Sequence, residues 1–137
     1  MNVKILASGS SGNCIHVQSG ETGILIDAGL PKTKIEKRLL ANNIDPTKLK
    51  AIFITHAHSD HIKGLPLANK YKISVYASEG EWKDIDSVDD DLCRFILKHS
   101  EAFKEIDLSE IKAFFFSSHA DTYGPLGAAG DVEGAAV

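Results

Sequence analysis

Short apolar runs separated by turn-forming residues recur along the chain and predict strands of a sheet. Ile24, Leu25 and Ile26 are consecutive apolar residues, which is typical of a strand buried on both faces. The expected strands cover residues 3–7, 14–18, 23–27, 51–55, 73–77 and 111–116. The first strands follow one another closely, as hairpins do.

Apolar residues at helical spacing predict helices between the later strands. In the segment 32–42, Ile35, Leu39 and Leu40 form one stripe, and Pro46 lies beyond its end. Further helices are expected over residues 60–71, 79–86 and 88–98. Hairpin strands followed by alternating strands and helices indicate an α/β (α+β) domain, a mixed sheet with helices packed on it.

Composition supports one ordinary globular domain. The chain has 137 residues, of which 43% are hydrophobic and 25% charged, and this excludes a disordered chain. No apolar run approaches the ~20 residues needed to span a bilayer, and the N-terminus turns polar at Ser8, too early for a signal peptide. Cys14 and Cys93 form neither a disulfide framework nor a zinc spacing, so we expect a cytoplasmic protein with reduced thiols.

Charge is distributed unevenly around a formal net value of −4. Residues 1–74 carry 10 Lys/Arg against 5 Asp/Glu, and residues 75–137 carry 5 against 14. A local basic cluster contains Lys32, Lys34, Lys37 and Arg38. We interpret it as a solvated helix face, with a nucleic-acid surface as the alternative. The net charge of −4 and the lack of a broad basic face disfavour the binding of long duplex DNA.

Four candidate metal ligands follow the apolar strand at 51–55: His56, His58, Asp60 and His61. Imidazole and carboxylate are ligands that suit zinc, manganese and iron. Alternation along an extended chain places His56 and His58 on the same side, where they can hold one ion. Chance surface histidines or a hydrogen-bonded core histidine are the alternative, but ligands in α/β proteins lie at such strand ends.

Asp60 and His61 are adjacent and in a strand would point to opposite faces. If a helix begins at Ser59 or Asp60, both side chains turn toward the same pocket, with Asp60 as the helix N-cap. The Asp60 charge would offset the repulsion of a cation by the positive end of the helix dipole, which in turn attracts an anionic substrate.

His119 also follows an apolar strand, and the same geometry would place it at the same edge of the sheet. There it would add a third imidazole to His56 and His58. A three-histidine zinc site with one open position activates water, because the metal lowers the pKa of bound water to ~7. His16 and His99 are expected to be structural or exposed.

The segment Thr55–His61 matches the His-x-His-x-Asp-His signature and resembles the metallo-β-lactamase superfamily. The segments 6–14, 25–29 and 116–119 resemble its WalJ/YycJ-like branch, so that the resemblance covers most of residues 1–125. It implies an αββα sandwich that carries one or two zinc ions, or manganese, at one edge.

By this resemblance His56, His58 and His119 hold the first metal, and Asp60 and His61 contribute to the second. Asp60 is the residue to which we assign a catalytic role. Asp27 matches an aspartate that supports the metal loop from behind the ligands. The branch is similar to phosphodiesterases and nucleases, in which two metals hold a hydroxide and stabilise charge on phosphorus.

Hydroxyl and amide side chains lie among the glycines of the segment 8–13. Two interpretations are equally supported: these side chains line the site and contact a phosphate, or the segment is a plain β-turn. The residues concerned are Ser8, Ser10, Ser11 and Asn13.

The chain departs from the branch after His119. The acid that follows this histidine directly in the branch is displaced by one position to Asp121, which we interpret as a turn residue rather than a site residue. Family members are longer and supply further ligands, so we expect only the N-terminal half of the sandwich, an incomplete domain over 1–125 and a flexible tail over 126–137. The remaining half would expose an apolar sheet face, which a second copy or a completing partner chain would cover.

Three functions remain open, and whether the chain is an active enzyme depends on the second metal site. The first is a two-metal phosphodiesterase or nuclease completed by dimerisation, acting with metal-activated hydroxide on DNA, RNA or a nucleotide. The second is a one-metal hydrolase of an ester, thioester or lactam. The third is a catalytically degenerate half-domain that binds metal or a partner.

Overall fold

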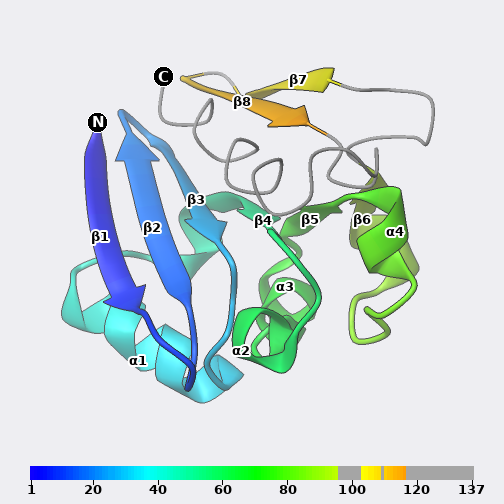
Figure 1. Cartoon of the computed structure of the whole chain (residues 1–137). Helices are drawn as coiled ribbons and strands as arrows, with labels where there is room; N and C mark the ends of the chain where they lie inside the picture. The colour runs from blue at the N-terminus through cyan, green and yellow to red at the C-terminus, as the bar shows by residue number, and fades with distance from the viewer. Residues whose placement is uncertain (96–102, 109, 117–137) are drawn as a thin grey trace.

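The central feature of the computed structural model is a six-stranded mixed sheet with the order β1-β2-β3-β4-β5-β6 (Figure 1). The structure describes residues 1–95, 103–108 and 110–116. The strands of this sheet are β1 (Asn2–Ala7), β2 (Cys14–Ser19), β3 (Thr22–Ile26), β4 (Leu49–Phe53), β5 (Ser74–Ala77) and β6 (Cys93–Phe95). The first three are antiparallel neighbours, and β3 to β6 run parallel. The expected mixed sheet is confirmed.

Helices connect the parallel strands. They are α1 (Lys32–Ala41), the 3-10 turn η1 (Pro46–Lys48), α2 (Ser59–Ile62), α3 (Pro66–Tyr71), α4 (Glu79–Trp82) and the 3-10 turn η2 (Asp90–Leu92). In α1, Ile35 and Leu39 are fully buried whereas Leu40 is exposed. No helix in the described part of the chain is both long and apolar enough to cross a bilayer.

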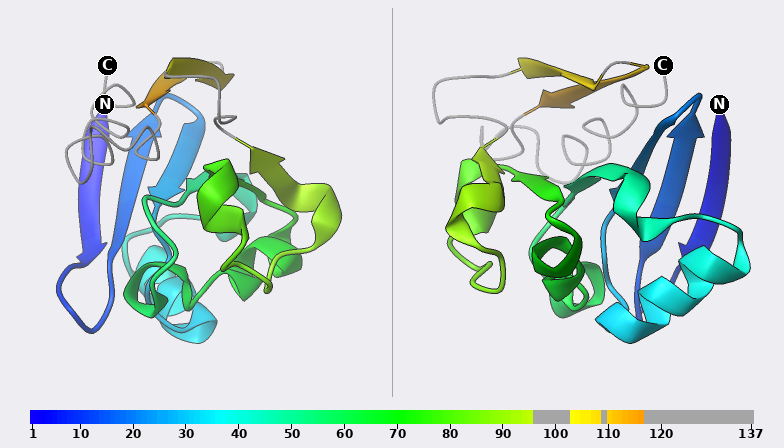
Figure 2. Two further views of the ribbon diagram at one scale, coloured as in Figure 1. Left: turned by 45° about the vertical axis from the view of Figure 1, so that its right-hand side comes forward. Right: turned by 180° about the vertical axis from the view of Figure 1, so that it is seen from behind.

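Apolar side chains cover both faces of the sheet. On one face α1 and α3 pack through residues such as Ile35, Leu39 and Leu67 against Leu25 and Ile52. On the other face lies a separate two-stranded antiparallel sheet formed by β7 (Phe103–Leu108) and β8 (Ile111–Phe116). Figures 1 and 2 show the helices and this hairpin on opposite sides of the six-stranded sheet.

The expected exposed apolar face is largely covered, which corrects the sequence-based expectation. Ile106 and Ile111 of the hairpin are buried against a cluster that includes Ile24 and Phe53. Strand β7 had no clear sequence signal, so its contribution was missed. The part of this face that stays open lies at β1, where Val3 and Ile5 are 54% and 68% exposed.

The helix expected over residues 60–71 is broken in two. Pro66 has no N–H to donate, and the N–H of Gly64 bonds to the carbonyl of Ala28 at 2.7 Å instead of continuing the helix. A side chain at Gly64 would collide with the carbonyl oxygen of Leu30. The break therefore follows from close packing of α2 and α3 on the segment after β3.

The helix expected over residues 88–98 is wrong in the part that the structure describes. Val88 and Leu92 are buried, but the chain forms the turn η2 up to Leu92 and then strand β6 from Cys93 onward. Cys93 pairs with Val75, so β6 extends the parallel sheet, and Phe95 is 53% exposed. Among the described residues, strand β8 pairs with β7 in a sheet separate from the one that leads into His56. The predicted position of His119 stays a prediction.

Several expectations fall outside the described residues: those for His99, His119 and Asp121 and the tail over 126–137. His16, expected to be structural or exposed, is buried in β2, and this burial lowers its pKa.

A polar contact between α1 and α3 gives a prediction for the pH dependence of stability. Glu36 accepts hydrogen bonds from the Lys70 ammonium at 2.6 Å and from the Tyr71 hydroxyl, and these bonds lower the pKa of Glu36. The stabilisation is therefore present above the ordinary carboxyl pKa of ~4.3 and is lost as the pH falls through the lowered value. We expect Glu36→Gln to reduce unfolding stability slightly at pH 7 and to have no effect at pH 2, measured by urea titration. An equal loss at both pH values would contradict this assignment.

Candidate metal centre

Three loops converge at one end of the sheet because of the strand directions. The segment after β3 begins at Asp27, and the histidine segment follows β4, which is parallel to β3. The loop of residues 8–13 precedes β2, which is antiparallel to β3, and therefore reaches the same end. Backbone hydrogen bonds join the three loops: Asn13 N–H donates to the Asp60 carbonyl and Gly29 N–H to the Asn13 carbonyl, both at 2.8 Å.

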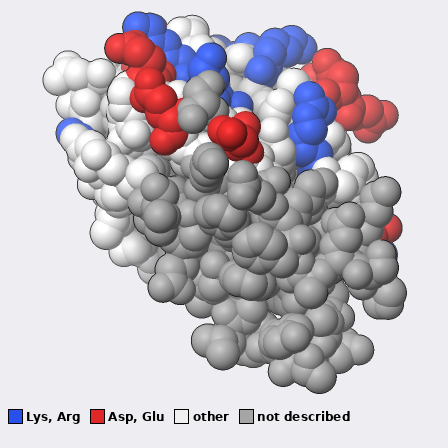
Figure 3. Space-filling view, turned by 90° about the horizontal axis from the view of Figure 1, so that it is seen from above, with Lys and Arg blue, Asp and Glu red and all other residues white. Residues whose placement is uncertain are grey.

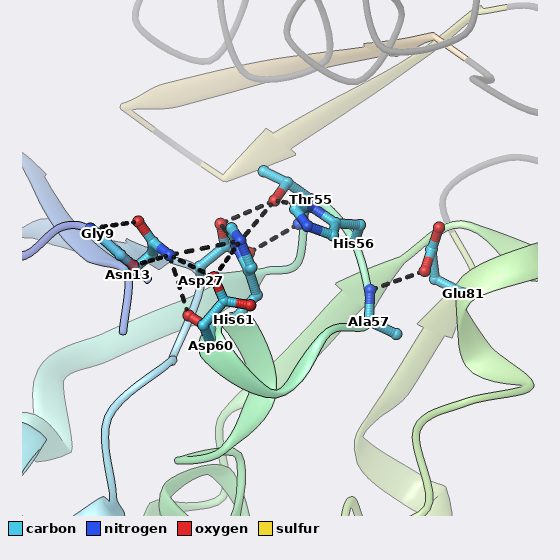
Figure 4. A network of polar contacts seen from close by, with 9 residues as sticks. All are labelled: Gly9, Asn13, Asp27, Thr55, His56, Ala57, Asp60, His61 and Glu81. Carbon is cyan, nitrogen blue, oxygen red and sulfur yellow. Dashed lines mark hydrogen bonds and ion pairs between the residues drawn. The ribbon is translucent and has the colours of Figure 1, made fainter. Parts of the chain in front are cut away.

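Asp27 lies at the centre of these contacts. Its carboxylate is buried and accepts from the Thr55 N–H and the Thr55 hydroxyl, each at 2.8 Å, and from His61 Nδ1 at 2.7 Å (Figure 4). Its backbone has a φ of 62°, a left-handed conformation that Asp tolerates better than most residues. Asp27 thus fixes both the start of the histidine segment and the ring of His61.

The four candidate ligands of the histidine segment lie close to one another in pairs. The ring centroid of His56 lies 4.6 Å from that of His58 and 3.8 Å from that of His61. Asp60 Oδ2 is 3.5 Å from His61 Nε2. Helix α2 begins at Ser59 with His58 as its N-cap residue, so the expected N-cap role of Asp60 is wrong, and Asp60 lies in the first turn.

The donor set fits a divalent metal in its chemistry. Two ligands bound to one zinc ion at ~2.1 Å in tetrahedral geometry lie about 3.4 Å apart, close to the separation of Asp60 Oδ2 and His61 Nε2. His61 Nδ1 is held by Asp27, which leaves Nε2 for a metal, the arrangement in which a carboxylate orients a histidine ligand. His56 packs against both other rings, and within the described ranges no group of three His, Cys, Asp or Glu side chains is gathered around a common point.

Neighbouring groups shift the pKa values of His56 and His61 in opposite directions. The hydrogen bond to Asp27 raises the pKa of His61. Burial lowers the pKa of His56, with His61 and His58 adding to this effect, whereas the carboxylates of Asp27 and Glu81 oppose it. The loop therefore favours a neutral His56, which is the protonation state that a metal ligand requires.

The loop of residues 8–13 is a turn closed by the Asn13 side chain. Asn13 Oδ1 accepts from the Gly9 N–H at 3.2 Å, and Asn13 Nδ2 donates to the Gly9 carbonyl at 3.0 Å. The same amide donates to Asp60 Oδ2 at 3.2 Å and lies 3.4 Å from His61 Nε2. The hydroxyl-bearing residues of the loop, Ser8, Ser10 and Ser11, are exposed, and their contact with a substrate stays a prediction.

Glu81 is a residue of this centre that the sequence did not reveal. It lies on α4, after β5, and its Oε2 accepts from the N–H of Ala57 at 2.8 Å. Ala57 lies between His56 and His58 in the chain. The only signal in the sequence was the place of Glu81 shortly after a parallel strand, at the same end of the sheet as the histidines.

The structure thus places a buried aspartate behind a histidine-rich loop at the end of a mixed sheet. Residues 7–125 match the family described as the metallo-beta-lactamase superfamily, and the chain belongs to it. The family assignment made from the histidine motif is confirmed, as is the mixed α/β fold.

Similar curated proteins are nucleases by name. The chain is 46% identical to "Exodeoxyribonuclease WalJ" of Streptococcus pneumoniae serotype 2 over 84 residues, 61% of this chain and 31% of that protein. It is 40% identical to "Exodeoxyribonuclease YycJ" of Bacillus anthracis over 87 residues, 63% of this chain and 33% of that protein. The matched part is thus about a third of the length of these relatives.

Solved structures of metallo-β-lactamases share the fold. The Rm3 metallo-beta-lactamase aligns with a TM-score of 0.69 at 22% identity, over 85% of this chain and 49% of that one. BJP-1, a subclass B3 metallo-beta-lactamase of Bradyrhizobium japonicum, aligns with a TM-score of 0.62 at 17% identity, over 77% and 45%. The chain therefore corresponds to about half of these structures.

Proposed function

We propose that the chain carries the metal-binding half of a metal-dependent hydrolase that cleaves phosphodiester bonds, of the nuclease type. The observation that supports this most directly is the histidine segment held by Asp27, with His61 Nε2 and Asp60 Oδ2 3.5 Å apart. Both curated relatives described above are named exodeoxyribonucleases, which favours a nucleic acid over a lactam or an ester as the substrate.

Zinc is the proposed metal, with one or two ions per chain and manganese as the alternative. His56, His58 and His119 would hold the first ion, and Asp60 and His61 would contribute to the second. A metal in such a site supplies a hydroxide at neutral pH and stabilises negative charge on phosphorus. The chain's own part is to orient the ligands: Asp27 fixes the His61 ring, and Asn13 fixes the Asp60 carboxylate.

A second copy of the chain or another chain stays the proposed partner at this site, since no three candidate ligands are gathered around one point among the described residues. Cytoplasmic location stays a prediction from the two free cysteines. The described part of the face seen in Figure 3 carries interspersed lysine, arginine and acidic side chains. The formal net charge of −4 favours a strand end or a nucleotide over long duplex DNA as the proposed substrate.

Metal content and hydrolysis test this function together. We expect purified wild-type protein to bind one to two zinc ions per chain by elemental analysis and to hydrolyse a phosphodiester substrate when zinc or manganese is present. His58→Ala and Asp60→Asn should each reduce this activity by more than the ~10–100-fold that loss of a residue behind a ligand costs. Glu21→Gln, an exposed position in the turn between β2 and β3 at the other end of the sheet, serves as the control.

The other two functions correspond to distinct outcomes of the same experiment. Activity that survives both Asp60→Asn and His61→Ala, but not His56→Ala, would replace the two-metal phosphodiesterase with a one-metal hydrolase. Metal binding without hydrolysis by any metal-loaded form would support a catalytically degenerate, partner-binding half-domain. Less than one metal per chain would contradict the proposed function itself.

A further inference from the structure

We propose that Glu81 is a positioning residue that holds the His56–Ala57–His58 segment in the shape needed for metal binding; this rests on the proposed function. The observation is one hydrogen bond between elements that are 24 residues apart in the chain: the Ala57 N–H donates to Glu81 Oε2 at 2.8 Å. Figure 4 shows Glu81 on the opposite side of the segment from Asp27.

The segment needs such a support because it lies beyond the hydrogen bonds of the sheet. Strand β4 ends at Phe53, and the last ladder-like bond is from the Ile54 N–H to the Tyr76 carbonyl at 2.9 Å. After that, the Thr55 N–H bonds to the carboxylate of Asp27 and the Ala57 N–H to that of Glu81. Two carboxylates from different elements thus take the place of a neighbouring strand on either side of His56.

The hydrogen bond from the Ala57 N–H to the Glu81 carboxylate is stronger than one between two neutral groups. A carboxylate that accepts from a backbone N–H forms a charge-assisted hydrogen bond, roughly twice as strong as a neutral one. Ala57 has no polar side-chain atom, so a hydrogen bond to this residue can be made only by its backbone. A fixed Ala57 peptide restricts the backbone dihedrals on both sides, and therefore the directions in which the His56 and His58 rings leave the chain.

Helix α4 is itself anchored, so that Glu81 is a defined support. Its Trp82 packs against the helix-side core cluster and donates from Nε1 to the Arg94 carbonyl at 2.7 Å. The Trp82 ring also lies 5.8 Å from the Phe95 ring. Glu81 therefore links the histidine segment to the β5–β6 side of the sheet, as Asp27 links it to the β3 side.

Two variants separate the hydrogen bond from the charge. Glu81→Ala removes both, whereas Glu81→Gln keeps an acceptor oxygen at the same reach and removes the charge. Glu79→Ala is the matched control, because Glu79 is an exposed acid on the same helix and its loss changes the net charge equally. Unfolding by urea, with chelator present, verifies that each variant folds.

The first measurement is amide hydrogen exchange of Ala57 in the metal-free full chain. We expect protection in the wild type, in Glu81→Gln and in Glu79→Ala, and at least about tenfold faster exchange in Glu81→Ala. The second measurement is the affinity for Co²⁺ in competition with a chelator, together with the visible absorption spectrum of the bound Co²⁺. Glu81→Ala should bind about 10–100-fold more weakly, with an altered spectrum, and Glu81→Gln should restore most of the affinity.

Three results would overturn the positioning role of Glu81, and a fourth would contradict the proposed function. Affinity of Glu81→Ala equal to that of Glu79→Ala would overturn the positioning role, and so would a Glu81→Gln protein as weak as Glu81→Ala, because the charge alone would then matter. An unprotected Ala57 amide in the wild type would overturn it as well. A wild-type protein that protects Ala57 but binds no Co²⁺ or Zn²⁺ contradicts the proposed function instead.

Discussion

Replacing Asp27 with alanine is expected to lower the free energy of unfolding by about 3–5 kcal/mol, the range measured when one partner of a buried charged pair is removed. Three donors lose their acceptor at once: the Thr55 N–H, the Thr55 hydroxyl and His61 Nδ1. We expect the same variant to bind zinc at least about 10–100-fold more weakly, because the His61 ring is no longer oriented. Denaturant titration in the presence of chelator measures the first effect, and chelator competition measures the second.

Two further substitutions at Asp27 separate the causes. Asp27 has a φ of 62°, so that alanine adds a backbone cost of roughly 1–2 kcal/mol which glycine avoids. Asp27→Gly should therefore be about 1 kcal/mol more stable than Asp27→Ala. Asp27→Asn tolerates this φ and keeps one acceptor oxygen, so that an intermediate loss of about 1.5–3 kcal/mol is expected. A loss below ~1 kcal/mol for Asp27→Ala would show that the buried carboxylate does not hold the loops together.

The sequence was sufficient to predict where the centre lies. Apolar runs define β3 and β4 to within two residues, and parallel neighbours bring the segments after them to one edge. The histidine motif indicated the family, and the family resemblance implied that Asp27 supports the metal loop from behind the ligands; the structure adds its contact with His61. Local pattern and topology agree in this part of the chain, and that agreement is why the prediction was possible.

The features that the sequence did not predict depend on contacts between distant segments. The Ala57–Glu81 hydrogen bond joins a backbone N–H to an acid 24 positions away, and the identity of residue 57 gives no sign of it in the sequence. The break between α2 and α3 arises because Gly64 approaches the carbonyl of Leu30. Strand β6 was mistaken for a helix because Val88 and Leu92, four positions apart, are also buried by a 3-10 turn that leads into an edge strand.

The hairpin β7–β8 covers most of the sheet face that a half-sandwich was expected to expose. A single sheet with helices on one face would leave Ile24 and Phe53 exposed, yet the hairpin buries both with Ile106 and Ile111. The described part of the chain thus has apolar cores on both sides of its sheet. A completing copy or partner would contact the uncovered part at β1 rather than the whole face.

Substituting Gly29 with alanine is expected to damage the centre without replacing any proposed ligand. Gly29 is the point where the three loops meet: a Cβ there would overlap the Asp60 carbonyl oxygen and lie 2.5 Å from the Asn13 nitrogen. Both neighbours are backbone atoms that bond to each other at 2.8 Å, so neither can move without breaking that bond. We expect a loss of about 3 kcal/mol in unfolding free energy, at the upper end of overpacking effects, together with weaker zinc binding.

Gly23→Ala is the matched control for Gly29→Ala, since Gly23 lies near the other end of β3. Its added Cβ meets the flexible end of Gln18 and lies 3.0 Å from His16 Nε2, and it approaches no backbone atom as closely. We expect this control to lose no more than about 1 kcal/mol and to keep the zinc affinity of the wild type. Zinc affinity that is unchanged in Gly29→Ala would mean that the Asp60–His61 pair holds its geometry independently of the loop after β3. A joint loss of stability and affinity in Gly29→Ala alone would show that metal binding depends on the contact among all three loops.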